Sequence, residues 1–312
     1  MLDVFSAPAS GDTRYPDVRA NYVLIDGSRR AEAERWLYAC FDTPDYRNLF
    51  DGTAWASVRQ AAPLLLCVEP DHPGLEPLLA ELKERECGYA MTSDAPLATL
   101  TSHLQRFIEV RHPLGHRVLL RIADPSVARV LLAPARDGGI ADAWSDITGV
   151  MLPDALWDGW HIQQRPEASS GEASDPDRTV TIPHPLNERT LNQLMAVDQR
   201  ATLVTLLRHL ETYFPTRLEN RLRADVVLGL RTLMNEALDS GYTSLQALTH
   251  WCSVFGYLGP PDSWARVAPE VHRIFRERVP QEGEARAREA AVLARELTRT
   301  TTPGRVDTWA YP

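Results

Sequence analysis

The chain has 312 residues, of which 44% are hydrophobic, and a formal net charge of −9. This length is typical of about two domains and allows a substantial buried core. The acidic balance argues against nucleic acid as a partner, because nucleic-acid-binding surfaces are rich in lysine and arginine. No apolar run approaches the roughly 20 residues of a membrane span. Without a visible secretion signal or a CxxC pair among the four cysteines, we expect a soluble, cytoplasmic protein.

Short apolar runs alternate with helical patterns in the first half of the chain. Ala33, Trp36, Leu37 and Cys40, for example, share one face of a helix. This alternation predicts an α/β lobe over residues 1–165 with a mainly parallel sheet and flanking helices. The expected strands cover residues 22–25, 62–69, 88–93 and 117–124, with an antiparallel pair at 147–152 and 156–164.

The second half has a different character. Residues 166–186 are rich in Pro, Ser, Asp and Glu, which is typical of a linker. Residues 187–312 show helical periodicity throughout and predict an all-α lobe. The last helix, from about residue 282 to 299, has only a thin apolar stripe at Val292, Leu293 and Leu297, so we expect it to be largely solvated.

Four expected strands end in an acidic residue: Asp26, Glu69, Asp94 and Asp124. At the carboxyl edge of a parallel sheet such residues could form the site of a metal-dependent phosphotransferase or a nucleotide-binding enzyme. The alternative is that they cap turns and helices, with Asp124 ahead of Pro125, Asp94 ahead of the next helix and Ser28 capping the helix after Asp26.

The second interpretation is favoured by the missing motifs. The chain has no GxGxxG, GxxxxGK[ST] or GxSxG sequence, and its histidines and cysteines are not at metal-ligand spacing. We therefore expect no catalytic, cofactor-binding or metal-binding residues, and Asp26 is interpreted as a turn residue.

Aromatic residues gather around the Gly-Pro-Pro turn at residues 259–261. Tyr257, Leu258 and Trp264 flank this turn. They either form a small core beneath the loop or are partly exposed, where such residues often anchor partners.

Several segments resemble, in order, a known family. They are "YVLIDGSR" (22–29), "LFDG" (49–52), "APLLLCV" (62–68) and "HLQRFIEVRHPLGHRVLLRIADPSV" (103–127). The family is that of the effector adaptors, or effector chaperones, of bacterial type VI secretion systems, catalogued as a domain of unknown function (DUF4123). The residues at its motif positions, interpreted as structural, are Asp26, Gly52, Arg121, Asp124 and Pro125. The chain departs from the motif at Ile122 and Ala123, where aromatics are usual, and at Ser126, where Arg is usual.

The resemblance implies a non-enzymatic role in the producing cell. Such adaptors hold a secreted toxic effector, commonly through a helical segment near its N-terminus, and load it onto the valine–glycine-repeat spike protein VgrG. On this reading a groove between the two lobes binds the effector, with Tyr257, Leu258 and Trp264 near its edge, while Arg121 and Asp124 pair at the end of their strand. The alternatives are the enzyme described above and an immunity or scaffold protein that binds a toxin without loading it.

Overall fold

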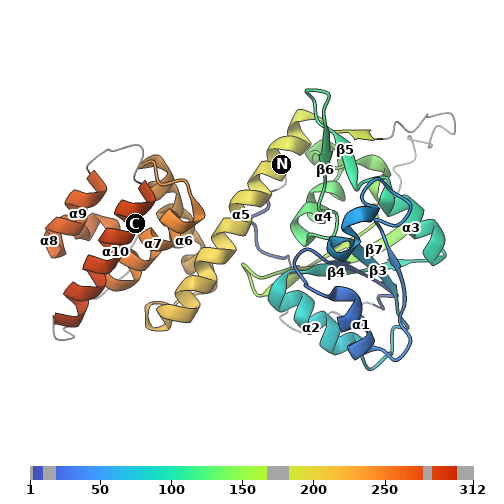
Figure 1. Ribbon diagram of the computed structural model, residues 1–312, viewed down its shortest axis with the longest axis horizontal. Coiled ribbons are helices and arrows are strands. Elements are labelled where there is room, and N and C mark those ends of the chain that lie inside the picture. The colour runs from blue at the N-terminus through green and yellow to red at the C-terminus, as the bar shows by residue number, and fades with distance from the viewer. Residues whose placement is uncertain (1–2, 10–18, 167–182, 277–282, 301–312) are drawn as a thin grey trace. The chain divides into compact units, whose positions relative to one another are not determined.

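The computed structural model describes residues 3–9, 19–166, 183–276 and 283–300 (Figure 1). The chain forms two compact units, Met1–Asp198 and Gln199–Pro312. The first is an α/β unit and the second is entirely helical in its described part, which confirms this part of the predicted fold class. No helix in the described ranges is long and apolar enough to cross a membrane.

The predicted domain limits, with a linker at 166–186, stay a prediction. Most of that linker, residues 167–182, lies outside the described residues. Its described end includes β9 (His184–Pro185), which pairs with β5 (Glu109–Arg111) of the first unit.

Six strands of the first unit form one sheet in the order β2-β3-β1-β4-β7-β8. They are β1 (Tyr22–Asp26), β2 (Asp45–Asn48), β3 (Pro63–Cys67), β4 (Gly88–Ser93), β7 (Ile147–Asp154) and β8 (Gly159–Gln164). All five neighbouring pairs are antiparallel. The prediction of a mainly parallel sheet is therefore wrong, whereas the predicted antiparallel extension by β7 and β8 is confirmed.

The position of β1 explains the difference. β3 and β4 run in the same direction and are joined by helix α2 (Leu75–Arg85), as expected of a strand–helix–strand unit. However, β1 lies between them and is antiparallel to both, which is a split β-α-β arrangement. The chain is reversed before β3 by β2, whose sequence DYRN contains no apolar run that could have revealed a strand.

The fourth expected strand is shorter than predicted. Only Arg117–Leu119 form a strand, β6, and it belongs to a separate three-stranded sheet in the order β6-β5-β9. β5 and β6 form an antiparallel hairpin. Gly115 closes its turn with a φ of 90°, a backbone conformation that glycine adopts without steric cost. The residues after β6 form turns that lead into helix α4.

The core of the first unit lies between the large sheet and its helices. Besides α2, these are α1 (Ala33–Cys40), α3 (Leu97–Gln105) and α4 (Pro125–Leu131). Every residue of β1 is buried. Val23 and Ile25 of this strand share one apolar cluster with Leu37 of α1 and Leu78 of α2. The helical spacing of apolar residues thus predicted α1 and α2 correctly.

Helix α5 (Glu188–Tyr213) contains the boundary between the two units. The helices that follow are α6 (Arg223–Asp239), α7 (Leu245–Leu258), α8 (Trp264–Val267), α9 (Pro269–Arg276) and α10 (Gly283–Thr300). α7 starts at an N-cap, where the Ser244 hydroxyl accepts a hydrogen bond from the Ala247 amide (3.1 Å).

Helix α10 differs from the expected solvated helix. It packs against α7 and α9, and its buried face includes four alanines, Ala287, Ala290, Ala291 and Ala294. Small side chains let helices approach closely, because the interaxial distance depends on the residues at the contact. The larger Val292 of the predicted stripe is instead 51% exposed.

The central position of β1 generates a stability prediction. Replacing the fully buried Leu24 by alanine should lower the free energy of unfolding by about 3 kcal/mol, because lost burial and the remaining cavity both destabilise the fold. The matched control is Leu114→Ala on a side chain that is 82% exposed, where the change should stay below about 0.5 kcal/mol. Urea unfolding of both variants measures the difference. Equal midpoints would contradict the central role of β1.

Candidate functional site

The structure separates the acidic strand ends. Because β3 and β4 are antiparallel to β1, Tyr22 at the start of β1 pairs with Cys67 and with Met91. Glu69 and Asp94 follow β3 and β4. They therefore lie beyond the strand ends near Tyr22, at the opposite end of β1 from Asp26. The four acidic residues do not form one site.

Asp26 and Asp124 do come together, through two arginines. Arg121 Nη2 donates to Asp26 Oδ2 at 2.8 Å, and Arg29 Nη2 donates to Asp124 Oδ2 at 2.8 Å. Arg121 Nη1 also lies 3.9 Å from Asp124 Oδ2. These four residues, here called the paired-charge cluster, join the turn after β1 to the start of α4. The expected Arg121–Asp124 contact exists, but the shorter ion pair of Arg121 is with Asp26.

Each aspartate also shapes its own turn. Asp26 Oδ1 accepts hydrogen bonds from the Ser28 amide (2.9 Å), the Ser28 hydroxyl (2.5 Å) and the Arg29 amide (3.3 Å). This confirms Asp26 as a turn residue. Asp124 Oδ1 accepts from the Ser126 amide at 2.9 Å, and Pro125 is the first residue of α4. Asp124 is therefore the helix cap that the sequence predicted.

Asp94 and Ser28 do not cap the helices that follow them, contrary to the prediction. α3 starts after Pro96, so Asp94 lies too early in the chain to bond the first free amides of that helix. α1 starts only after Glu32, whereas Ser28 bonds to Asp26 within the preceding turn. Both predictions placed the helix start too close to the end of the strand.

Burial and ion pairing set the electrostatics of the cluster. Asp26 and Asp124 are only 4% and 3% exposed. Burial alone would raise the pKa of Asp26, but hydrogen bonds from Ser28 and Arg121 outweigh it and hold this pKa below its ordinary value of 3.8. Burial raises the pKa of Asp124 above its ordinary value, although Arg29 and Arg121 oppose the shift.

A third segment meets the cluster through Arg29. Its Nη1 donates to the main-chain oxygen of Glu86 at 2.8 Å, at the C-terminal cap of α2. The Glu86 carboxylate in turn accepts from the Ala155 amide at 2.8 Å, in the turn between β7 and β8. Both aspartates are therefore held by arginine and by main-chain amides, an arrangement that fixes turns in place. Within the described residues, no group of three or more His, Cys, Asp or Glu could hold a metal ion.

Arg29 is the member of the cluster that sequence reasoning missed. The two turns carry the same charges, three residues apart, in opposite order: Asp26 before Arg29, and Arg121 before Asp124. This mirrored order lets each aspartate meet the arginine of the other turn. It was a signal available in the sequence.

The remaining motif position, Gly52, lies in a turn after β2. Its φ is 74°, which favours glycine, and the space beside it is open. Gln105 of α3 donates to the main-chain oxygens of Leu49 and Asp51 in the same turn (3.1 and 3.0 Å). The motif thus fixes a turn against α3.

The expected partner-binding residues lie largely in the core of the second unit. Trp264 is 1% exposed, and its Nε1 donates to the main-chain oxygen of Gly259 at 2.9 Å. Leu258 is buried as well. Tyr257 is half-buried, and its ring lies edge-on to Phe214 with 4.9 Å between centroids. Their role in partner binding stays a prediction, and Tyr257 is the most accessible of the three.

A second group of buried polar side chains consists of Asp154, His161 and Arg129. The sequence pattern did not single out this group. His161 Nε2 lies 2.7 Å from Asp154 Oδ2. The same carboxylate has Arg129 Nη1 at 3.9 Å. Arg129 also donates to the main-chain oxygens of Asp3 and Val4 (3.1 and 3.3 Å) and so holds the segment 3–9. These contacts fix a hairpin and a chain segment.

The paired-charge cluster lies within a segment that matches a family model. Residues 21–137 match the model described as "Domain of unknown function (DUF4123)". The chain carries a DUF4123 domain. This DUF4123 segment runs from β1 past α4 and contains all four charges of the cluster.

The similarity to one curated protein extends beyond the DUF4123 segment. The chain is 23% identical over 273 residues to "Accessory protein VasW" of Vibrio cholerae serotype O1 (strain ATCC 39315 / El Tor Inaba N16961). The aligned region covers 88% of this chain and 87% of that protein. No solved structure matches the chain significantly.

The lowered pKa of Asp26 generates a pH prediction. The carboxylate stabilises the fold above its ordinary pKa of 3.8, and this stabilisation is lost as the pH falls through the lower, folded-state value. Asp26→Asn should therefore cost about 1–2 kcal/mol near pH 7, a value kept small because the Arg121 side chain is 47% exposed. The cost should shrink toward pH 3, as measured by urea unfolding at each pH.

The matched control is Asp45→Asn, which removes an exposed carboxylate paired with Arg47 on the surface (3.2 Å). It should change the stability by less than about 0.5 kcal/mol at any pH. A cost of Asp26→Asn that is the same at both pH values would contradict the ion-pair explanation.

Proposed function

We propose that this protein is a non-enzymatic effector adaptor of a type VI secretion system. In this role it binds a toxic effector, through a helical segment near the effector's N-terminus, and presents it to the spike protein VgrG. The DUF4123 match over residues 21–137 carries the proposal. The similarity to a protein named as an accessory protein, over most of both chains, supports it.

The geometry of the motif residues favours this role over an enzyme that uses the acidic strand ends. Such an enzyme needs carboxylates that converge on a substrate or metal ion. Here Glu69 and Asp94 lie beyond the opposite edge of the sheet from Asp26, and Asp26 and Asp124 are each paired with an arginine. These residues support the α/β unit, which leaves protein binding as the better-supported function.

Co-purification tests the proposal directly. The tagged chain is co-expressed with a candidate effector and a VgrG protein from the same genome, and size-exclusion chromatography follows the products. We expect a stable complex with the effector that is lost when the effector's N-terminal segment is deleted. VgrG should join the complex only when the adaptor is present.

The control is the same effector co-expressed with an unrelated protein that carries the same tag. If the purified chain retains neither the effector nor VgrG, the adaptor proposal is wrong. Retention of an effector that is inactive in the producing cell, without any transfer to VgrG, would instead indicate an immunity or scaffold protein.

Tyr257 provides a residue-level test of the predicted contact site. If this half-buried ring contacts the effector, Tyr257→Ala should weaken binding about tenfold, as loss of an aromatic anchor typically does. Tyr257→Phe keeps the ring against Phe214 and serves as the matched control. Thermal melting shows whether the alanine variant stays folded, and calorimetry measures its affinity. Unchanged affinity in a folded Tyr257→Ala variant excludes this position.

A further inference from the structure

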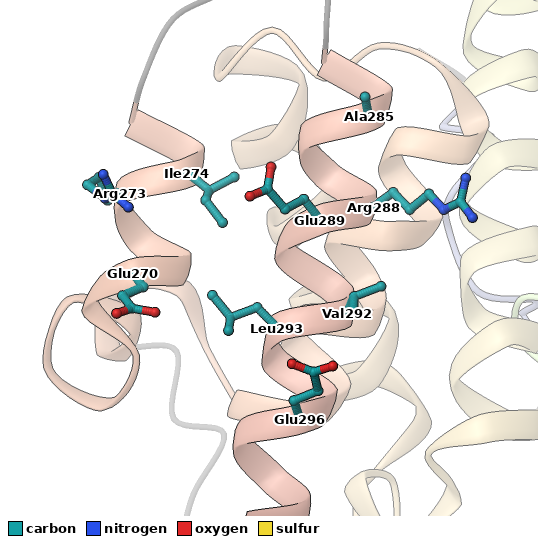
Figure 2. Close-up of a pocket in the computed structure, with 9 residues that line it drawn as sticks. All are labelled: Glu270, Arg273, Ile274, Ala285, Arg288, Glu289, Val292, Leu293 and Glu296. Atoms are coloured by element: carbon teal, nitrogen blue, oxygen red, sulfur yellow. The ribbon is translucent and has the colours of Figure 1, made fainter.

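A groove of about 640 Å³ runs between α9 and α10 in the helical unit (Figure 2). It exists because α10 uses its alanine face to pack against its neighbours and leaves larger apolar side chains elsewhere on the helix. Ile274 of α9 and Leu293 of α10 point toward each other across the groove (Figure 2). Val292 and Ala285 also line the groove, but Val292 points away from α9, on the same side of α10 as Arg288 (Figure 2).

The charged side chains around the groove are arranged by sign. Glu289 projects into the gap between the helices, and Glu270 and Glu296 line its other end (Figure 2). Arg273 points away from α10, and Arg288 points away from α9. The surface that faces an occupant is therefore apolar along its floor and acidic along its rim.

The three glutamates are available to a partner. All three are exposed, and in the described part of the chain none of their carboxylates takes part in a hydrogen bond or ion pair. The lining also includes Arg273 and Arg288, but the three carboxylates outnumber them, and an acidic excess is complementary to lysine or arginine.

The dimensions of the groove fit a helix. Its lining residues on α10 run from Ala285 to Glu296, three turns that span roughly 16 Å. A helix bound in an apolar groove uses anchors at positions i, i+3 or i+4, and i+7, which cover a similar length.

We propose that this groove binds an amphipathic, basic helical segment of the effector. Its apolar residues pack on Ile274 and Leu293, and its lysines or arginines lie against Glu270, Glu289 and Glu296. This inference rests on the proposed adaptor function and places the effector site entirely within the helical unit. It differs from the predicted site at Tyr257, which is not part of the groove lining.

The experiment measures binding of the effector's N-terminal segment to the full-length chain by calorimetry, at low and at high salt. Leu293→Asp disrupts the apolar floor, and Glu289→Lys reverses one charge of the rim. The matched controls are Val267→Asp, on a side chain of α8 that is 44% exposed, and Glu219→Lys, on an exposed residue; neither lines the groove. Thermal melting identifies any variant that does not fold.

We expect each groove variant to weaken binding about tenfold or more, with the controls within about twofold of wild type. High salt should weaken wild-type binding and should affect Glu289→Lys less, because one attractive pair is already lost. Glu289→Lys alters only an exposed side chain, so it tests the groove even if Leu293→Asp fails to fold.

The possible failures are distinguishable. If the wild-type chain does not bind the effector at all, the adaptor function itself is wrong. If the wild type binds and the folded groove variants bind equally well, or the controls weaken as much as the groove variants, the effector site is elsewhere and this inference alone is overturned.

Discussion

The crossed ion pairs of the paired-charge cluster hold together turns that are 95 residues apart in the chain. A buried carboxylate is costly unless a cation and hydrogen-bond donors compensate it, so each aspartate fixes the position of the arginine that it needs. Arg29 also bonds to the end of α2. The turn after β1, the start of α4 and the end of α2 are thereby held in one geometry. The two aspartates and Arg121 contribute to the fold, which gives these motif positions a structural role.

Much of the fold could be predicted from local patterns. The spacing of apolar residues located α1, and the expected cap Asp124 marked the start of α4. The directions of the strands could not be predicted in this way. An apolar run indicates a strand but does not show whether the strand is parallel or antiparallel to its neighbours. The information that decided it lay in the polar strand β2, which no hydrophobic pattern could reveal. The fourth strand was predicted too long because Leu120 and Ile122 are buried and apolar although they lie outside any strand.

The candidate site shows a similar division. Asp26, Arg121 and Asp124 were identified by their motif, but their partners depended on tertiary structure, and Arg29 was overlooked. In the helical unit, side-chain size was misleading. We expected the last helix to be largely solvated, yet α10 buries its alanines and leaves Val292 of the thin apolar stripe exposed. Close helix packing selects small residues, so the remaining larger ones become available for a partner.

Helix α4 connects the paired-charge cluster at its start with the segment 3–9, which is distant in sequence. Asp124 caps its start, and Arg129 on the same helix holds the main chain of residues 3–6. Val4 and Arg129 are 125 residues apart in sequence. Contacts this distant form only after the intervening loop has closed, which is slow. We therefore expect the segment 3–9 to reach its final position late, after α4 is in place.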